Sequence, residues 1–109
     1  MIQHKELAEG RWQEMSFCEQ MANIGSEVSR TIKWKEKQNS IQSQKAFERA
    51  LELIDITLTT NPRMTALKEL CRLRENLCDE YNKTELNGLS QINKYLFQFA
   101  IAVKKIKTN

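Results

Sequence analysis

Histidine, proline and glycine are scarce in this chain of 109 residues, which has one histidine, one proline and three glycines. A zinc site of His and Cys needs three or four clustered ligands, and a Ser or Cys nucleophile needs a histidine base within the folded domain. The single histidine, His4, lies near the amino terminus, and the three glycines are scattered and form no phosphate-binding loop. We therefore expect no catalytic residue, no cofactor and no metal ion.

Long apolar runs are also missing, and there are three cysteines. No segment approaches the roughly 20 apolar residues of a membrane span, and the first ten residues lack the apolar core of a signal peptide. Cys71 and Cys78 would lie about 10 Å apart along one helix, which is too far for a disulfide bond. Because the number of cysteines is odd, they cannot all be paired within one chain. Free thiols used as small apolar residues are typical of a reducing compartment, so we expect a cytoplasmic protein without membrane contact.

Apolar residues recur with helical spacing over most of the chain. Ser16 and Glu19 have the spacing of a capping box and predict a helix over residues 16–37. A second helix is predicted over residues 43–60, because its apolar residues recur at four-three-four spacing. These residues are Phe47, Leu51, Ile54 and Leu58.

Two more helices follow in the second half of the chain. Asn61 and Pro62 have the form of an N-cap and first helical position, and they predict a third helix that ends near Tyr81. A fourth begins at Leu89 or Ser90. Short connections favour antiparallel neighbours, so the expected fold is all-α: an up-down-up-down antiparallel four-helix bundle. We expect residues 15–109 to form one domain, with residues 1–14 as a flexible or frayed segment. The expected fully buried residues are Leu51, Ile54, Leu96 and Phe99.

Three segments resemble known proteins. They are MSFCEQMANIGSEV at 15–28, followed by Trp34 and Lys35; KAFERALELID at 45–55; and LKEL at 67–70, followed by Arg72, Arg74 and Glu75. Through these segments the chain resembles a small uncharacterised prokaryotic family of helical bundles. The resemblance implies the bundle fold and brings no activity with it. The loop at 82–88 is shorter than the loop usual in that family.

The fourth helix carries apolar residues on two faces. Phe97 and Ile101 lie about opposite its main apolar stripe, and Leu53 and Ile56 lie similarly off the stripe of the second helix. The main stripe of the fourth helix comprises Leu89, Ile92, Leu96, Phe99, Val103 and Ile106. An outward apolar patch predicts a homo-oligomer, most simply a two-fold homodimer. The alternative is that both helices rotate and these residues line a wider core.

Polar residues also fall on apolar faces. Arg74 lies near the middle of the third helix's stripe, and Asp55 and Glu27 lie at the edges of two others. We expect these three residues to form an internal polar cluster, because a buried guanidinium must be paired. One interpretation is an ion pair that fixes helix register; the other is a pocket in which Arg74 holds an anionic ligand. We favour the ion pair, since no base or nucleophile accompanies Arg74.

The net charge of +3 arises in the last segment, where residues 82–109 carry five lysines against Glu85 alone. Nucleic acid could contact these lysines and the basic end of the first helix. The candidate residues are Lys33, Trp34, Lys37, Lys104, Lys105 and Lys107. Nearby acidic residues at the end of the third helix weaken this hypothesis, since nucleic-acid-binding domains are usually strongly basic.

The expected function is therefore a non-catalytic helical-bundle interaction module that self-associates and binds a protein partner, which can be a larger protein. The alternative is an accessory RNA- or DNA-binding bundle that uses its lysine-rich helix ends. An enzyme with an unusual internal site around Arg74 is the least favoured interpretation.

Overall fold

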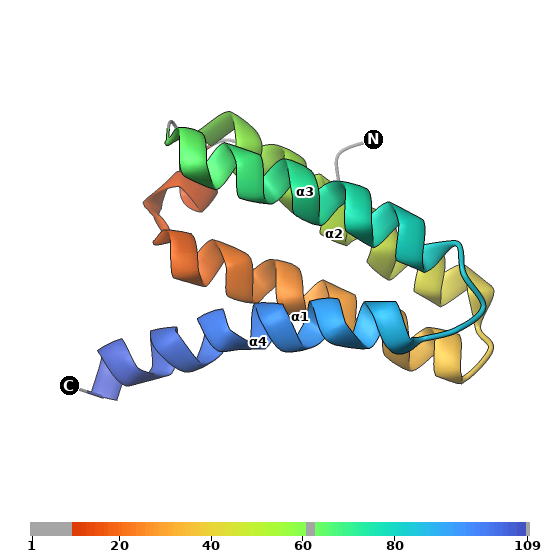
Figure 1. The fold of residues 1–109 in the computed structure, drawn as a ribbon. Coiled ribbons are helices and arrows are strands. Elements are labelled where there is room, and N and C mark those ends of the chain that lie inside the picture. Colours follow the sequence, from red (N-terminus) through yellow and green to blue (C-terminus); the bar gives the residue numbers. More distant parts are fainter. Residues whose placement is uncertain (1–9, 61–62, 109) are drawn as a thin grey trace.

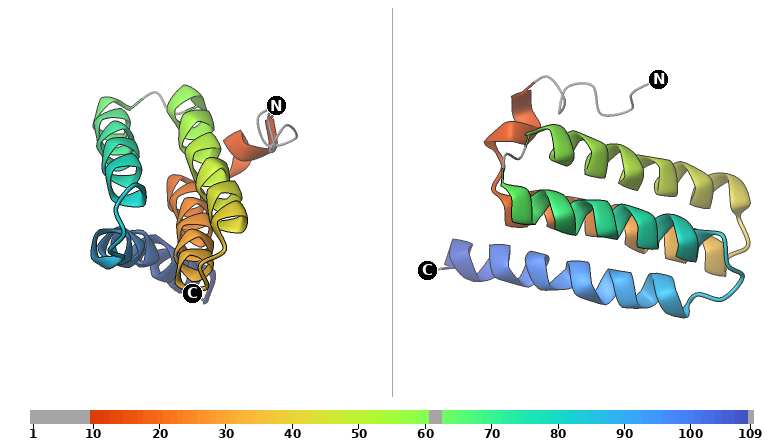
Figure 2. Two further views of the ribbon diagram at one scale, coloured as in Figure 1. Left: turned by 90° about the vertical axis from the view of Figure 1, so that its right-hand side faces the viewer. Right: turned by 45° about the horizontal axis from the view of Figure 1, so that its top comes forward.

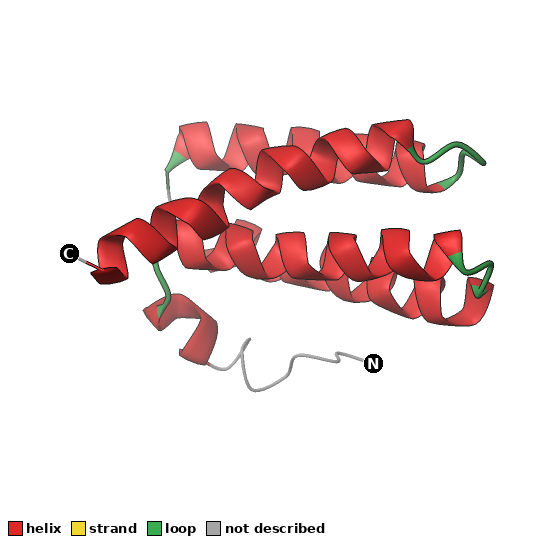
Figure 3. Ribbon diagram, turned by 90° about the horizontal axis from the view of Figure 1, so that it is seen from below, coloured by secondary structure: helices red, strands yellow, loops and turns green. Residues whose placement is uncertain are grey.

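The computed structural model describes residues 10–60 and 63–108. This part of the chain forms a short 3-10 helix, η2 (Trp12–Glu14), and four long helices: α1 (Phe17–Glu36), α2 (Ser40–Thr60), α3 (Met64–Tyr81) and α4 (Asn87–Thr108). Successive long helices run in opposite directions (Figure 1). Figure 3 shows that helices make up the regular structure throughout the described ranges. The predicted all-α four-helix bundle is confirmed.

The helix starts follow from side-chain caps. The Ser16 hydroxyl accepts a hydrogen bond from the Glu19 amide at 3.1 Å, and the Glu19 carboxylate accepts one from the Ser16 amide at 3.1 Å. The predicted capping box is thus present. Helix α2 begins three residues before the predicted Ser43, because the Asn39 side chain accepts from the Gln42 amide at 3.0 Å and caps the earlier turn. The predicted cap at Asn61 and Pro62 lies outside the described residues.

Helix α1 is the centre of the packing. It packs closely against both α2 and α4, whereas α3 meets its neighbours α2 and α4 much less closely. Figure 2 shows α1 beside α2 on one side of the bundle and α3 above α4 on the other. At Gly25 a Cβ atom would lie only 3.0 Å from the Cβ of Leu96, so this glycine permits the close approach of α4 to α1. The α1 side of the bundle is therefore tight, and the α3 side is more open.

The amino-terminal segment contributes to the core. Trp12 is fully buried, and its indole Nε1 donates a hydrogen bond to the Thr57 hydroxyl at 2.9 Å. The Trp12 carbonyl accepts from the Gln20 side chain at 2.9 Å. The expectation of a frayed segment up to residue 14 is therefore wrong for η2, which packs onto α2. Residues 1–9 lie outside the described residues.

The core was only partly predicted. Ile54 and Leu96 are fully buried, as expected, but Leu51 and Phe99 are half-buried. Small residues of α2 are buried as well: Ser43, Ala46 and Ala50. Leu51 lies one residue, about 100°, around the helix from the buried Ala50 and therefore at the edge of the buried face. Phe99 packs at the rim, edge-to-face against Phe17 and Tyr95.

Lys35 connects the ends of α1 and α3. Its ammonium donates hydrogen bonds to the Tyr81 carbonyl and, at 3.1 Å, to the Lys83 carbonyl, and it lies 4.6 Å from the centre of the Tyr81 ring. Lys35→Met should lower the free energy of unfolding by about 0.5–1.5 kcal/mol, because carbonyls at a helix C-terminus lose their cationic donor. Urea unfolding measures this loss. Lys33→Met, at an exposed position on the same helix, is the control; equal losses in the two variants would contradict the capping role of Lys35.

Candidate functional site

Two apolar side chains of α4 face outward, as predicted. Phe97 is 62% exposed and Ile101 is 42% exposed. The other two residues of the expected interface, Leu53 and Ile56, are buried, so their assignment to an outward face is wrong. The reason is that α2 is contacted by α1, α3 and η2, and these three neighbours cover more than one stripe of it.

A hollow of about 380 Å³ lies directly beside Phe97, between α1 and α4. Small side chains of α1 line it together with residues of α4; the lining residues are Ala22, Gly25, Ser26, Ser29, Arg30, Asn93, Leu96, Phe97 and Ala100. The Ser29 hydroxyl donates to the Asn93 side chain at 2.6 Å and joins the two helices across it. We call Phe97, Ile101 and this hollow the α1/α4 face. It combines an apolar projection with an adjacent depression.

The expected internal polar cluster is divided into two separate ion pairs. Arg74 does pair with Asp55, through Nε to Oδ1 at 2.8 Å and Nη2 to Oδ2 at 3.3 Å. These side chains are 40% and 52% exposed, so the pair lies at the surface between α2 and α3, not inside the bundle. The loose packing of α3 leaves the guanidinium in contact with solvent. The hydrogen bond to Asp55 raises the pKa of Arg74.

Glu27 belongs to a different and better buried group. Its carboxylate is 6% exposed and accepts hydrogen bonds from Arg30 and from Arg49, both at 3.0 Å. Arg49 comes from α2, so this group connects α1 to α2. The expectation that Glu27 joins Arg74 is wrong, because Glu27 lies on the side of α1 that meets α2, whereas Arg74 reaches α2 from α3.

The candidate nucleic-acid residues do not form one surface. Lys33, Trp34 and Lys37 lie at the end of α1, where the Lys37 ammonium is 5.3 Å from the centre of the Trp34 ring. Lys104 and Lys105 lie near the end of α4, which runs antiparallel to α1, so the two groups are at opposite ends of the bundle (Figure 1). The side chain of Lys107 lies outside the described residues. Nucleic-acid binding stays a prediction, and the described candidate residues are divided between the two ends of the bundle.

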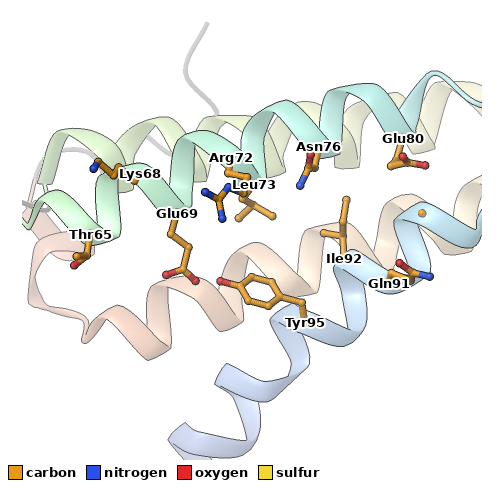
Figure 4. Close-up of a pocket in the computed structure, with 11 residues that line it drawn as sticks. Thr65, Lys68, Glu69, Arg72, Leu73, Asn76, Glu80, Gln91, Ile92 and Tyr95 are labelled. Carbon is orange, nitrogen blue, oxygen red and sulfur yellow. The ribbon is translucent and has the colours of Figure 1, made fainter.

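A groove with a volume of about 800 Å³ lies between α3 and α4 (Figure 4). It exists because α3 and α4 meet only loosely. Polar and apolar side chains both line it; the lining residues are Thr65, Lys68, Glu69, Arg72, Leu73, Asn76, Glu80, Gly88, Gln91, Ile92 and Tyr95. The groove was not predicted, because these residues carry no motif and periodicity does not show how far apart two helices lie.

One polar atom in this groove stands out. The hydroxyl oxygen of Tyr95 is buried and has no hydrogen-bond partner among the residues that the structure describes. Its ring packs edge-to-face on Phe99 at 5.5 Å between ring centres. Figure 4 shows the ring extending from α4 toward Glu69 on α3, with Arg72 above it. A buried hydroxyl without a partner is unfavourable, so a group that supplied an acceptor there would be stabilised.

Over residues 10–60 and 63–108, no group of three or more His, Cys, Asp or Glu side chains is arranged to hold a metal ion. None of the helices described is both long enough and apolar enough to cross a membrane. The candidate sites are therefore the α1/α4 face and the α3/α4 groove.

No protein-family model, curated protein or solved structure matches this chain. The resemblance to small uncharacterised prokaryotic bundles accordingly stays a prediction from the sequence.

Proposed function

We propose that this protein is a non-catalytic interaction module that self-associates through the α1/α4 face. The observation that carries the proposal is the exposure of Phe97, an aromatic side chain 62% accessible to solvent beside a hollow lined by small residues. Large apolar side chains exposed next to each other typically mark an interaction site. A second copy of this chain is the occupant that the face itself suggests.

The shape of the face supports a two-fold arrangement. In a two-fold dimer the same patch is used by both subunits, so a projection must meet a depression within one patch. Phe97 provides the projection and the hollow beside Gly25 and Ser29 provides the depression. Rotation about an axis close to Phe97 brings each Phe97 over the hollow of the other copy. Ile101, one helical turn further on, extends the apolar contact.

The expected dimer is weak. Full burial of a Phe or Ile side chain contributes about 1.5–3 kcal/mol, and Phe97 and Ile101 are already partly buried in one copy. Part of that gain is offset by the loss of translational and rotational freedom on association. We therefore propose an assembly that depends on concentration, and whose face stays open to a protein partner when the chain is monomeric.

Sedimentation velocity over a range of protein concentrations tests the proposal. The wild type should shift from monomer to dimer as its concentration rises, and Phe97→Glu combined with Ile101→Lys should stay monomeric with unchanged helix content. The matched control is Ile41→Glu combined with Met64→Lys, because these two apolar residues are at least as exposed as Phe97. This control should still dimerise.

Three outcomes would contradict the proposal. One is a wild type that stays monomeric at every concentration tested. Another is a control variant that loses dimerisation as fully as the Phe97 variant does. The last is unfolding of the Phe97 variant, which would show that Phe97 and Ile101 line a core instead of an interface.

A further inference from the structure

We infer that the α3/α4 groove is a binding site for a small organic anion, namely a carboxylate or phosphate group attached to an apolar body. This site is separate from the α1/α4 face, because it lies between a different pair of helices and shares none of its lining residues. The inference does not depend on self-association.

The dimensions of the groove suit a small molecule. Its volume of about 800 Å³ lies within the range of roughly 300–1,000 Å³ that is usual for ligand sites. Leu73 of α3 is buried and Ile92 of α4 is half-buried, and both line the groove. An apolar floor with a few polar groups around it is the common composition of such sites.

The unpaired charges in the groove favour an anion. Lys68 and Arg72 lie one helical turn apart on α3, and neither makes an ion pair with any residue of the described ranges. Of the two carboxylates that line the groove, Glu80 is already paired with Lys83 at 2.9 Å. Within the described ranges, the unpaired charges that line the groove are then two cations, Lys68 and Arg72, and one carboxylate, Glu69. A carboxylate or phosphate bound by Arg72, with Lys68 one helical turn away, would balance the excess and gain charge-assisted hydrogen bonds.

The Tyr95 hydroxyl supplies a hydrogen-bond donor in the same place. It is buried without a partner, and Figure 4 shows that its ring extends toward Glu69, with Arg72 on the same helix above it. The oxygen is shielded from solvent in this arrangement, so a ligand reaches it only after a neighbouring side chain moves. Arg72 lines the same groove and is exposed, so its side chain is free to follow the ligand. An anionic oxygen bound to Arg72 would then accept the hydroxyl's hydrogen bond and relieve the cost of its burial.

An NMR titration of the full chain with benzoate and, separately, with phenyl phosphate tests the inference. These probes share an aromatic body and differ in the anionic group, so the tighter of the two identifies the preferred headgroup. Saturable shifts should appear in the amides of residues 65–80 and 88–95. Benzamide, an uncharged analogue, should cause no saturable shift in these residues.

Variants then assign the roles. Arg72→Gln and Tyr95→Phe should each weaken binding of the preferred probe about tenfold or more, as expected for a hydrogen bond to a charged group. Lys94→Gln, an exposed cation of α4 outside the groove, should bind as the wild type does. Tyr95→Phe should not lower the unfolding temperature of the free protein, because the hydroxyl has no partner to lose.

The inference is overturned if neither anion gives saturable shifts up to about 10 mM, the weak limit of a specific site. It is also overturned if the shifts map to the α1/α4 face, or if Arg72→Gln binds as tightly as the wild type. Loss of self-association in the Phe97 variant, with intact anion binding, would separate the two proposals.

Discussion

Trp12→Ala is expected to lower the free energy of unfolding by about 3–5 kcal/mol, the usual cost of truncating a fully buried aromatic residue. The indole fills part of the core and also donates to the Thr57 hydroxyl. Its removal leaves a cavity between η2 and α2 that the surrounding helices cannot fully close. Urea unfolding followed by circular dichroism measures the change.

Trp34→Ala is the matched control for this prediction. Trp34 is the other tryptophan of the chain and is only half-buried near the end of α1. Its truncation removes the same number of atoms and should cost clearly less than the truncation of Trp12. Equal losses in the two variants would show that η2 is not part of the cooperative core.

Arg30→Met combined with Arg49→Met should lower the free energy of unfolding by about 3–5 kcal/mol, because it leaves the buried Glu27 carboxylate without a cation. Each arginine alone should cost less, since the other still pairs with Glu27. Adding Glu27→Gln to the double variant should recover much of the loss. Urea unfolding of the four variants completes the comparison.

Arg74→Met is the control for charge removal at an exposed pair. Arg74 and Asp55 are both substantially exposed, so breaking their ion pair should cost less than about 1 kcal/mol. If the double arginine variant is as stable as Arg74→Met, burial of Glu27 has no energetic consequence and the expected contrast between the two ion pairs fails.

Local features of the fold could be predicted from the sequence, because they depend on residues close together in the chain. The capping box at Ser16 requires only the side chain three residues later, and it forms as predicted. The pairing of Arg74 is not local in this sense, because Asp55 lies 19 residues away on another helix; the expected pairing with a carboxylate formed, but at the surface and not inside the bundle. The outward orientation of Phe97 follows from helical geometry alone.

Features that depend on distances between helices could not be predicted. Trp12 precedes the first helix and belongs to no periodic pattern, and its partner Thr57 is 45 residues away in sequence. Leu53 and Ile56 are buried because α2 has three neighbouring elements. The number of neighbours cannot be inferred from the periodicity of apolar residues in one helix. The α3/α4 groove arises from the same cause, since periodicity identifies which face of a helix is apolar and not how closely the next helix approaches it.

Gly25 connects the stability of one helix with the proposed assembly. A glycine in mid-helix costs about 1 kcal/mol relative to alanine, so Gly25→Ala would favour α1 as an isolated helix. The added methyl group would meet Leu96 at 3.0 Å and would also fill part of the hollow beside Phe97. Because glycine has no Cβ atom, Gly25 determines both the distance from α1 to α4 and the depth of the hollow. Selection for a more stable helix at this position would act against self-association, and the two properties constrain each other.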